Sequence, residues 1–97
     1  MKRSHYEITA ILRPEGSPET IRQFAERVDE IIRQYEGTVL SLQSWGERKL
    51  AYEIKKATEA YYTFITFEAP ETAPALIESD IRIMEQVLRF LIVKQEA

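Results

Sequence analysis

One segment of the chain has the pattern of a long amphipathic helix with a defined start and a defined end. Ser17 supplies a capping hydroxyl, Pro18 occupies the first helical position, and the acid Glu19 follows, which is the usual order of helix-start signals. Apolar side chains then recur at helical spacing and form one stripe: Ile21, Phe24, Ala25, Val28, Ile31, Ile32 and Tyr35. Gly37 is a typical stop just beyond that stripe. The spacing predicts a helix that buries one face against another layer.

Four further segments have strand patterns, three of them with the two-residue alternation of half-buried strands. The predicted strands span residues 6–12, 38–54, 61–67 and 87–94, with turns at residues 13–16 and 56–60. In the second strand, Leu50, Tyr52 and Ile54 alternate with polar or small residues and are predicted to face a core. Gly46 interrupts this strand and indicates a bulge or a sharp bend. A bulge there leaves open whether Val39 or Leu42 faces inward.

A second, less regular helix completes the pattern. It is predicted to start near residues 72–74, with Ala73, Ile77, Ile81 and Met84 as its apolar side. The order is then β-α-β-β-α-β, the ferredoxin-like split arrangement. The predicted class is α+β, with a four-stranded antiparallel sheet and two helices on one face. A chain of 97 residues is expected to form one domain, residues 1–97, with its own core.

The sheet face without helices has an unusual predicted composition. The strand alternation places there Glu7, Thr9, Ile11, Tyr62, Phe64, Thr66, Arg89, Leu91 and Val93. This set is more apolar than a solvated face requires, and apolar patches of this kind mark interaction surfaces. The predicted protein-partner face consists of Ile11, Tyr62, Phe64, Leu91 and Val93. The alternative is that these side chains cover one another across the strands and need no partner.

Basic residues gather at chain ends, strand ends and the foot of the second helix. The net charge of −3 argues against indiscriminate binding of a polyanion, so an interpretation as a nucleic-acid binder rests on local clusters. The candidate RNA-binding residues are Lys2, Arg3, Arg48, Lys49, Lys55, Lys56, Arg82 and Arg89. Neighbouring strand ends lie side by side in this fold, so these cations can converge on phosphates. Alternatively, each is a solvated charge beside a carboxylate.

Several functional classes find no support in the composition. The chain has no cysteine, and therefore no disulfide and no thiolate metal site. Its one histidine, His5, lies in an N-terminal segment expected to be mobile, with no nucleophile nearby. We therefore expect no enzyme activity, catalytic residue, metal, cofactor or small-molecule substrate. Neither a signal peptide nor a membrane-spanning run is recognisable, so a cytoplasmic protein without a membrane partner is expected.

The segment from Trp45 to Lys56 reads W-G-E-R-K-L-A-Y-E-I-K-K. Its G-x-R-K-L-A-Y-x-I-K run resembles the signature of the bacterial small-subunit ribosomal protein S-six family. The opening Y-E-I, the first helix ending in Y-x-G and the final I-R-I-x-E-x-V-L-R-F-L-x-V-K extend this resemblance over nearly the whole chain. It implies a non-enzymatic ribosomal component that binds the central domain of small-subunit rRNA together with ribosomal protein S-eighteen.

The resemblance also assigns roles by position. Arg82 and Arg89 match the family's basic residues after the second helix and at the last strand. The basic pair of the signature and the lysine that follows it correspond here to Arg48, Lys49 and Lys56. The chain departs from the family pattern at Glu53 and Ala60, which replace a usual proline and a usual glycine, and at Glu36, which replaces the first of a common glycine pair. In addition, Met84-Glu85-Gln86 replaces an acid-rich turn. These departures are expected to alter turns and edges and to leave the core intact.

Two other functions fit the same order of elements. A free-standing reader of single-stranded RNA, of the RRM type, stacks bases on aromatic side chains of a central strand, and Tyr62 and Phe64 imitate such a pair. However, the first strand offers no aromatic side chain to that face, and Ala60 and Tyr61 replace the basic residue and the glycine of that motif. The other alternative is a ferredoxin-like interaction module that dimerises through its sheet.

Overall fold

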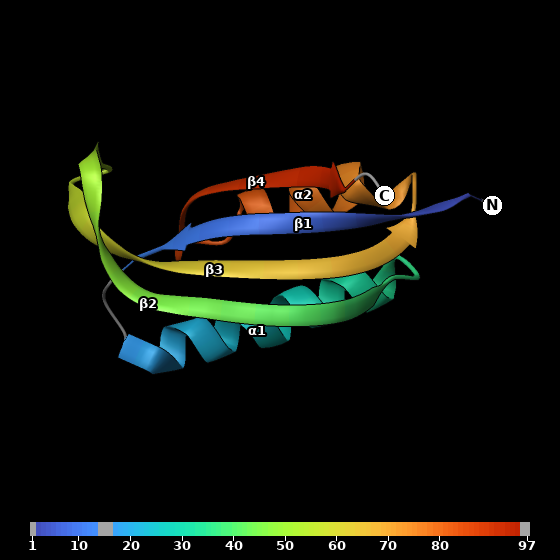
Figure 1. Ribbon diagram of the computed structural model, residues 1–97, viewed down its shortest axis with the longest axis horizontal. Coiled ribbons are helices and arrows are strands. Elements are labelled where there is room, and N and C mark those ends of the chain that lie inside the picture. Colours follow the sequence, from blue (N-terminus) through green and yellow to red (C-terminus); the bar gives the residue numbers. More distant parts are fainter. Residues whose placement is uncertain (1, 14–16, 96–97) are drawn as a thin grey trace.

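The computed structural model describes residues 2–13 and 17–95 (Figure 1). The elements are β1 (Arg3–Leu12), α1 (Ser17–Gln34), β2 (Thr38–Ile54), β3 (Ala57–Pro70), α2 (Ala73–Arg82) and β4 (Val87–Gln95). The four strands form one antiparallel sheet in the order β2-β3-β1-β4. This confirms the predicted α+β class and the order β-α-β-β-α-β. Most of the turn predicted at residues 13–16 lies outside the described residues.

The main core lies between the sheet and the two helices. The predicted stripe of α1 is confirmed, because Phe24, Val28, Ile31 and Ile32 are fully buried. Ala73, Ile77 and Ile81 bury the matching side of α2. Met84, predicted on the same stripe, packs against the main core from beyond the end of α2. The chain just beyond α1 also contacts α2, since the Tyr35 hydroxyl donates a hydrogen bond of 2.9 Å to Asp80 Oδ2. This hydrogen bond raises the pKa of Tyr35.

Gly37 follows the end of α1, as predicted, but for a different physical reason. The residue with the left-handed conformation is Glu36, whose φ is 66°. Gly37 donates its backbone N–H to the carbonyl of Ile32 at 2.8 Å. A Cβ atom at Gly37 would lie 2.7 Å from Ile32 Cγ2 and 3.0 Å from the backbone oxygen of Glu68. The glycine is therefore required by the close approach of α1 to β3.

The bend predicted at Gly46 is confirmed, and it is one of three irregularities in β2. The pairing of β2 with β3 shifts between Val39 and Ser41, between Ser44 and Gly46, and between Lys49 and Ile54. Gly46 itself has a φ of 75°, which a glycine adopts without strain. The first shift resolves the open choice of face, because Val39 packs against the main core and Leu42 is exposed.

The β2–β3 hairpin is longer than predicted. Ile54 pairs with Ala57, so the turn consists of Lys55 and Lys56, with φ values of 49° and 69°. Two-residue hairpin turns of this type need positive φ at both positions. The prediction of a turn over residues 56–60 is therefore wrong, since all but the first of these residues belong to β3. Figure 1 shows the hairpin tip rising at one end of the sheet.

A second buried cluster explains this extension of the hairpin. Its members are Ile54, Ala57, Ala60 and Leu88, and the partly buried Ile11 and Leu50 pack against it. Two predictions fail here. Tyr52 does not share the buried face of Leu50 and Ile54, because the pairing is irregular at this point and its side chain is 60% exposed. Ala60, expected at an edge, is fully buried.

The start of β4 also departs from simple alternation. The β1–β4 pairing shifts between Ile11 and Leu12. As a result, Val87 joins the main core while Leu88 joins the second cluster. Phe90 and Ile92, which alternate with the open positions of β4, pack against the main core.

Candidate protein and nucleic-acid interfaces

The five residues predicted as a partner face lie on neighbouring strands of the sheet. β1 lies between β3 and β4, and Thr9 pairs with both Phe64 and Leu91. Two residues after Thr9, Ile11 pairs with Tyr62 and Arg89. Two residues before Thr9, Glu7 pairs with Val93. Since residues paired across strands share a face, these side chains form one surface, called here the open face.

The open face keeps large apolar side chains in contact with solvent. Leu91 and Val93 are 61% and 48% exposed, whereas Ile11, Tyr62 and Phe64 are half-buried. Trp45 extends the surface, because its ring centroid lies 4.7 Å from that of Phe64 while 55% of its surface stays exposed. Trp45 was not among the residues predicted to form this face. The open face can therefore offer a protein partner several exposed apolar side chains.

One end of the open face is covered by the chain itself. Ile11 packs against the second cluster, which includes Ile54 and Ala57 of the β2–β3 hairpin. Beside Ile11 remains a hollow of about 310 Å³ lined by Thr9, Ile11, Arg89, Phe90 and Leu91. For Ile11 the structure thus supports the alternative that an apolar side chain is covered within the molecule, at least on its hairpin side.

Three of the predicted basic residues converge at the start of β4. A hollow of about 290 Å³, called here the β4 groove, is lined by Lys55, Glu78, Arg82, Val87, Leu88, Arg89 and Phe90. Its cations come from the hairpin turn, the last turn of α2 and β4. Arg82 forms an ion pair with Glu78 one helical turn earlier. Arg89 Nη1 donates a hydrogen bond of 2.7 Å to the Tyr52 hydroxyl.

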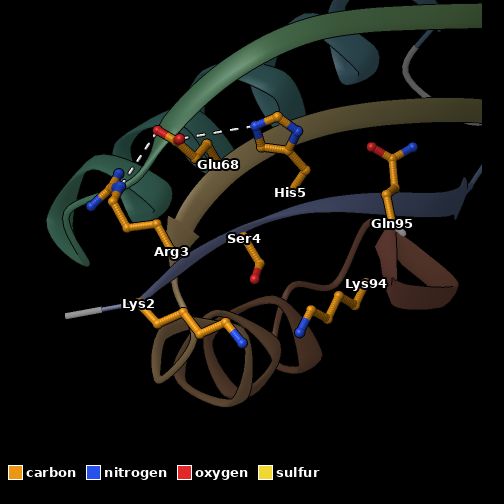
Figure 2. Close-up of a pocket in the computed structure, with 7 residues that line it drawn as sticks. All are labelled: Lys2, Arg3, Ser4, His5, Glu68, Lys94 and Gln95. Carbon is orange, nitrogen blue, oxygen red and sulfur yellow. Dashed lines mark hydrogen bonds and ion pairs between the residues drawn. The ribbon is translucent and has the colours of Figure 1, made fainter. Parts of the chain in front are cut away.

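Lys2 and Arg3 line a different hollow, at the other end of β4. This hollow of about 650 Å³ is lined by Lys2, Arg3, Ser4, His5, Glu68, Lys94 and Gln95 (Figure 2). Arg3 reaches Glu68, with its Nε atom 3.4 Å from Oε1, and also donates to the Glu36 carbonyl at 2.9 Å. His5 Nε2 lies 3.9 Å from the other oxygen of Glu68. His5 belongs to β1 opposite Glu68, so the expectation that it lies in a mobile segment is wrong.

Glu71, an acid outside the prediction, holds Lys94, another cation of this hollow. Glu71 accepts hydrogen bonds from Lys94 Nζ and from Ser4 Oγ, both at 2.7 Å. These two hydrogen bonds lower the pKa of Glu71, and the bond from Lys94 has the larger effect. Arg3 and Lys94 are therefore each paired with a carboxylate of the chain. By contrast, the partner of Arg89 in the β4 groove is a neutral phenol.

The other predicted basic residues line neither of these two hollows. Arg48 and Lys49 are exposed on β2, where Lys49 pairs in register with Glu59 of β3. Lys56 is exposed as the second residue of the hairpin turn. Within residues 2–13 and 17–95, no group of three or more histidine, aspartate or glutamate side chains is placed to hold a metal ion. None of the helices in this part of the chain is long and apolar enough to cross a membrane.

The sheet topology and the single helical layer define a ferredoxin-like α+β protein. A family model described as Ribosomal protein S6 matches residues 5–94. The small ribosomal subunit protein bS6 of Clostridium kluyveri is 42% identical over 91 residues, which cover 94% of this chain and 96% of that protein. The bS6 protein of Alkaliphilus metalliredigens is 39% identical over 89 residues, covering 92% of this chain and 94% of that protein.

A solved structure agrees with these sequence relationships. The crystal structure of 30S ribosomal protein S6 from Thermotoga maritima superimposes with a TM-score of 0.89 at 30% sequence identity. The match covers 97% of this chain and 89% of that one. The chain belongs to the ribosomal protein S6 family, as the resemblance implied. It is thus a small-subunit ribosomal protein, cytoplasmic and associated with ribosomes.

Proposed function

We propose that this protein binds the central domain of small-subunit rRNA together with ribosomal protein S-eighteen, as a structural component without catalytic activity. Family membership supports a place in the small subunit. The observation that carries the proposal further is the open face, on which Trp45, Leu91 and Val93 remain about half exposed or more. Exposed apolar patches of this kind are typical of surfaces that a partner covers.

The protein partner occupies the open face in this proposal. Its contacts are Ile11, Tyr62, Phe64, Leu91 and Val93, with Trp45 added on the structural evidence. Aromatic side chains with a large apolar area are the usual anchors of protein interfaces. The neighbouring hollow beside Leu91 offers room for an apolar side chain of the partner.

The RNA is held through its phosphates in this proposal. The contacts are those expected from the sequence: Lys2, Arg3, Arg48, Lys49, Lys55, Lys56, Arg82 and Arg89. The major groove of an A-form helix is too narrow for side chains to read, so contacts to phosphate and to overall shape are expected to dominate. The overall charge of −3 opposes tight binding of RNA by this protein alone. A basic partner would add the missing charge and surface.

We therefore expect weak binding of rRNA by the isolated protein and tighter binding when the partner is present. The measurement is a titration of a central-domain rRNA fragment, first with this protein alone and then with ribosomal protein S-eighteen added. The partner alone is the control. Tight binding that does not depend on the partner would contradict the proposal, and so would a partner that fails to increase affinity.

A further inference from the structure

The β4 groove joins three parts of the chain that are distant in sequence. Lys55 comes from the hairpin turn, Arg82 from the last turn of α2 and Arg89 from β4, and all three line the same hollow. Each of these cations is exposed. An anion that enters the groove is therefore within reach of three separate elements.

The charges of the groove do not cancel. Among the described residues that line it, Glu78 is the one acid, and it is paired with Arg82. Lys55 makes no ion pair with the described side chains, and Arg89 is bound to a neutral hydroxyl. Two positive charges thus remain for a ligand. The guanidinium of Arg89 has five N–H donors, of which the Tyr52 hydroxyl accepts one.

Tyr52 connects the hairpin to β4. Its hydroxyl accepts the hydrogen bond from Arg89, and its ring centroid lies 5.8 Å from the guanidinium carbon, within the range of a cation–π contact. The pairing of β2 with β3 is irregular between Lys49 and Ile54, so it does not fix this part of β2. The contact between Tyr52 and Arg89 joins this part of β2 to β4. Tyr52 lies three residues before Lys55, the first residue of the hairpin turn.

This contact has little to do with folding stability. Both side chains are exposed, and pairs of exposed side chains contribute little to the free energy of unfolding. Its consequence is geometric, because it orients the guanidinium of Arg89 and keeps Lys55 near the groove. Planar arginine donors in a fixed orientation suit two oxygens of one phosphate group.

We infer that the β4 groove is a preformed site for one phosphate group of an RNA backbone and that Tyr52 is its positioning residue. This inference rests on the proposed function for the identity of the ligand. It adds that Lys55 and Arg89 act as one unit: the second cluster packs the hairpin beside Leu88 of β4, and the Tyr52 hydroxyl sets the orientation of Arg89 within that unit. The hydroxyl of Tyr52 acts on the RNA through Arg89.

The first test uses the complex of this protein with ribosomal protein S-eighteen and two central-domain rRNA helices of different sequence. Binding is measured at several salt concentrations. Lys55→Gln and Arg89→Gln should each lower the salt slope by about one unit on both helices. In the double variant, the decrease in salt slope should be smaller than the sum of the decreases in the two single variants, because the residues form one site. Arg27→Gln, on the exposed side of α1, is the matched control for loss of charge.

Tyr52→Phe separates positioning from charge, because it keeps every cation and the aromatic ring. Loss of one hydrogen bond should weaken RNA binding about three- to tenfold. The melting temperature should not move. Tyr61→Phe is the matched control, since Tyr61 packs against the main core and makes no hydrogen bond through its hydroxyl with the described residues. Binding by Tyr52→Phe that equals binding by Tyr61→Phe would overturn the positioning role.

A second measurement does not depend on RNA. In an NMR titration of the protein alone with inorganic phosphate, signals of Lys55, Arg82 and Arg89 should shift together with one dissociation constant, and Tyr52→Phe should weaken that response. Shifts spread evenly over Lys2, Lys49 and the other cations would overturn the inference. A phosphate response in the groove without RNA binding by the complex would contradict the proposed function and leave the anion site established.

Discussion

Ile8→Ala is expected to lower the free energy of unfolding by about 2–5 kcal/mol. Ile8 is fully buried in β1, one of the two central strands of the sheet. It pairs with Ile65 of β3 and with Ile92 of β4, and it belongs to the main core beneath both helices. Removing its side chain leaves a cavity that the sheet cannot close, because strands on both sides fix the backbone of β1.

Chemical denaturation followed by circular dichroism measures this loss. The matched control is Leu91→Ala, which removes an apolar side chain of similar size from the exposed side of β4. The control should change the free energy of unfolding by about 0.5 kcal/mol or less, as is usual for surface positions. Similar losses for the two variants would mean that Leu91 is part of the folded core and that the open face is wrongly placed.

Phe64→Ala is expected to weaken association with the protein partner by about 1–3 kcal/mol, the usual loss for an interface anchor. Phe64 is half-buried on the open face, and its ring contacts Trp45, which is itself exposed. Its loss therefore removes apolar area that a partner would cover. The free energy of unfolding should fall much less than in Ile8→Ala, because the main core lies on the other side of the sheet.

Calorimetric titration with ribosomal protein S-eighteen measures the association, and denaturation measures the stability. Thr66→Ala is a suitable control, because it changes the next outward position of β3 without removing an aromatic anchor. The prediction is refuted if Phe64→Ala and Ile8→Ala lose the same stability while association with the partner is unchanged. That result would place Phe64 in the core.

Local patterns were sufficient to predict the order of elements and the main core. The stripe of α1 depends only on helical periodicity, and the four fully buried side chains from Phe24 to Ile32 all belong to the seven that it predicts. The bend at Gly46 could also be predicted, because a glycine in a strand pattern has few other roles. Both features are encoded within a few consecutive residues.

The hairpin could not be predicted in the same way. Its turn at Lys55–Lys56 lacks the glycine or asparagine that favours positive φ, so the sequence showed no turn signal of the expected kind. The positions of Tyr52 and Leu88 depend on shifts in strand pairing, which cross-strand packing decides and single-strand alternation does not reveal. Glu36 likewise adopts a left-handed conformation at a position where the related family usually has glycine.

The sequence predicts which residues are candidates for the sites, but it does not predict which of them lie together. Eight basic residues could be named from the sequence, yet only the structure separates the three in the β4 groove from Lys2 and Arg3 at the other end of the strand. Tyr52 was missed because alternation predicted it to be buried. Lys94 and Glu71 were missed because an ion pair between the turn that follows β3 and the end of β4 has no local signal.

Reconstitution of small ribosomal subunits tests the central claim most directly. Particles are assembled from rRNA and a complete set of purified small-subunit proteins that lacks this family's member, with or without ribosomal protein S-eighteen. The present protein is then added, and the particles are separated on a sucrose gradient. We predict that it sediments with the particles at a single copy, and only when ribosomal protein S-eighteen is present. Recovery of the protein at the top of the gradient, with all other components assembled, would contradict the claim.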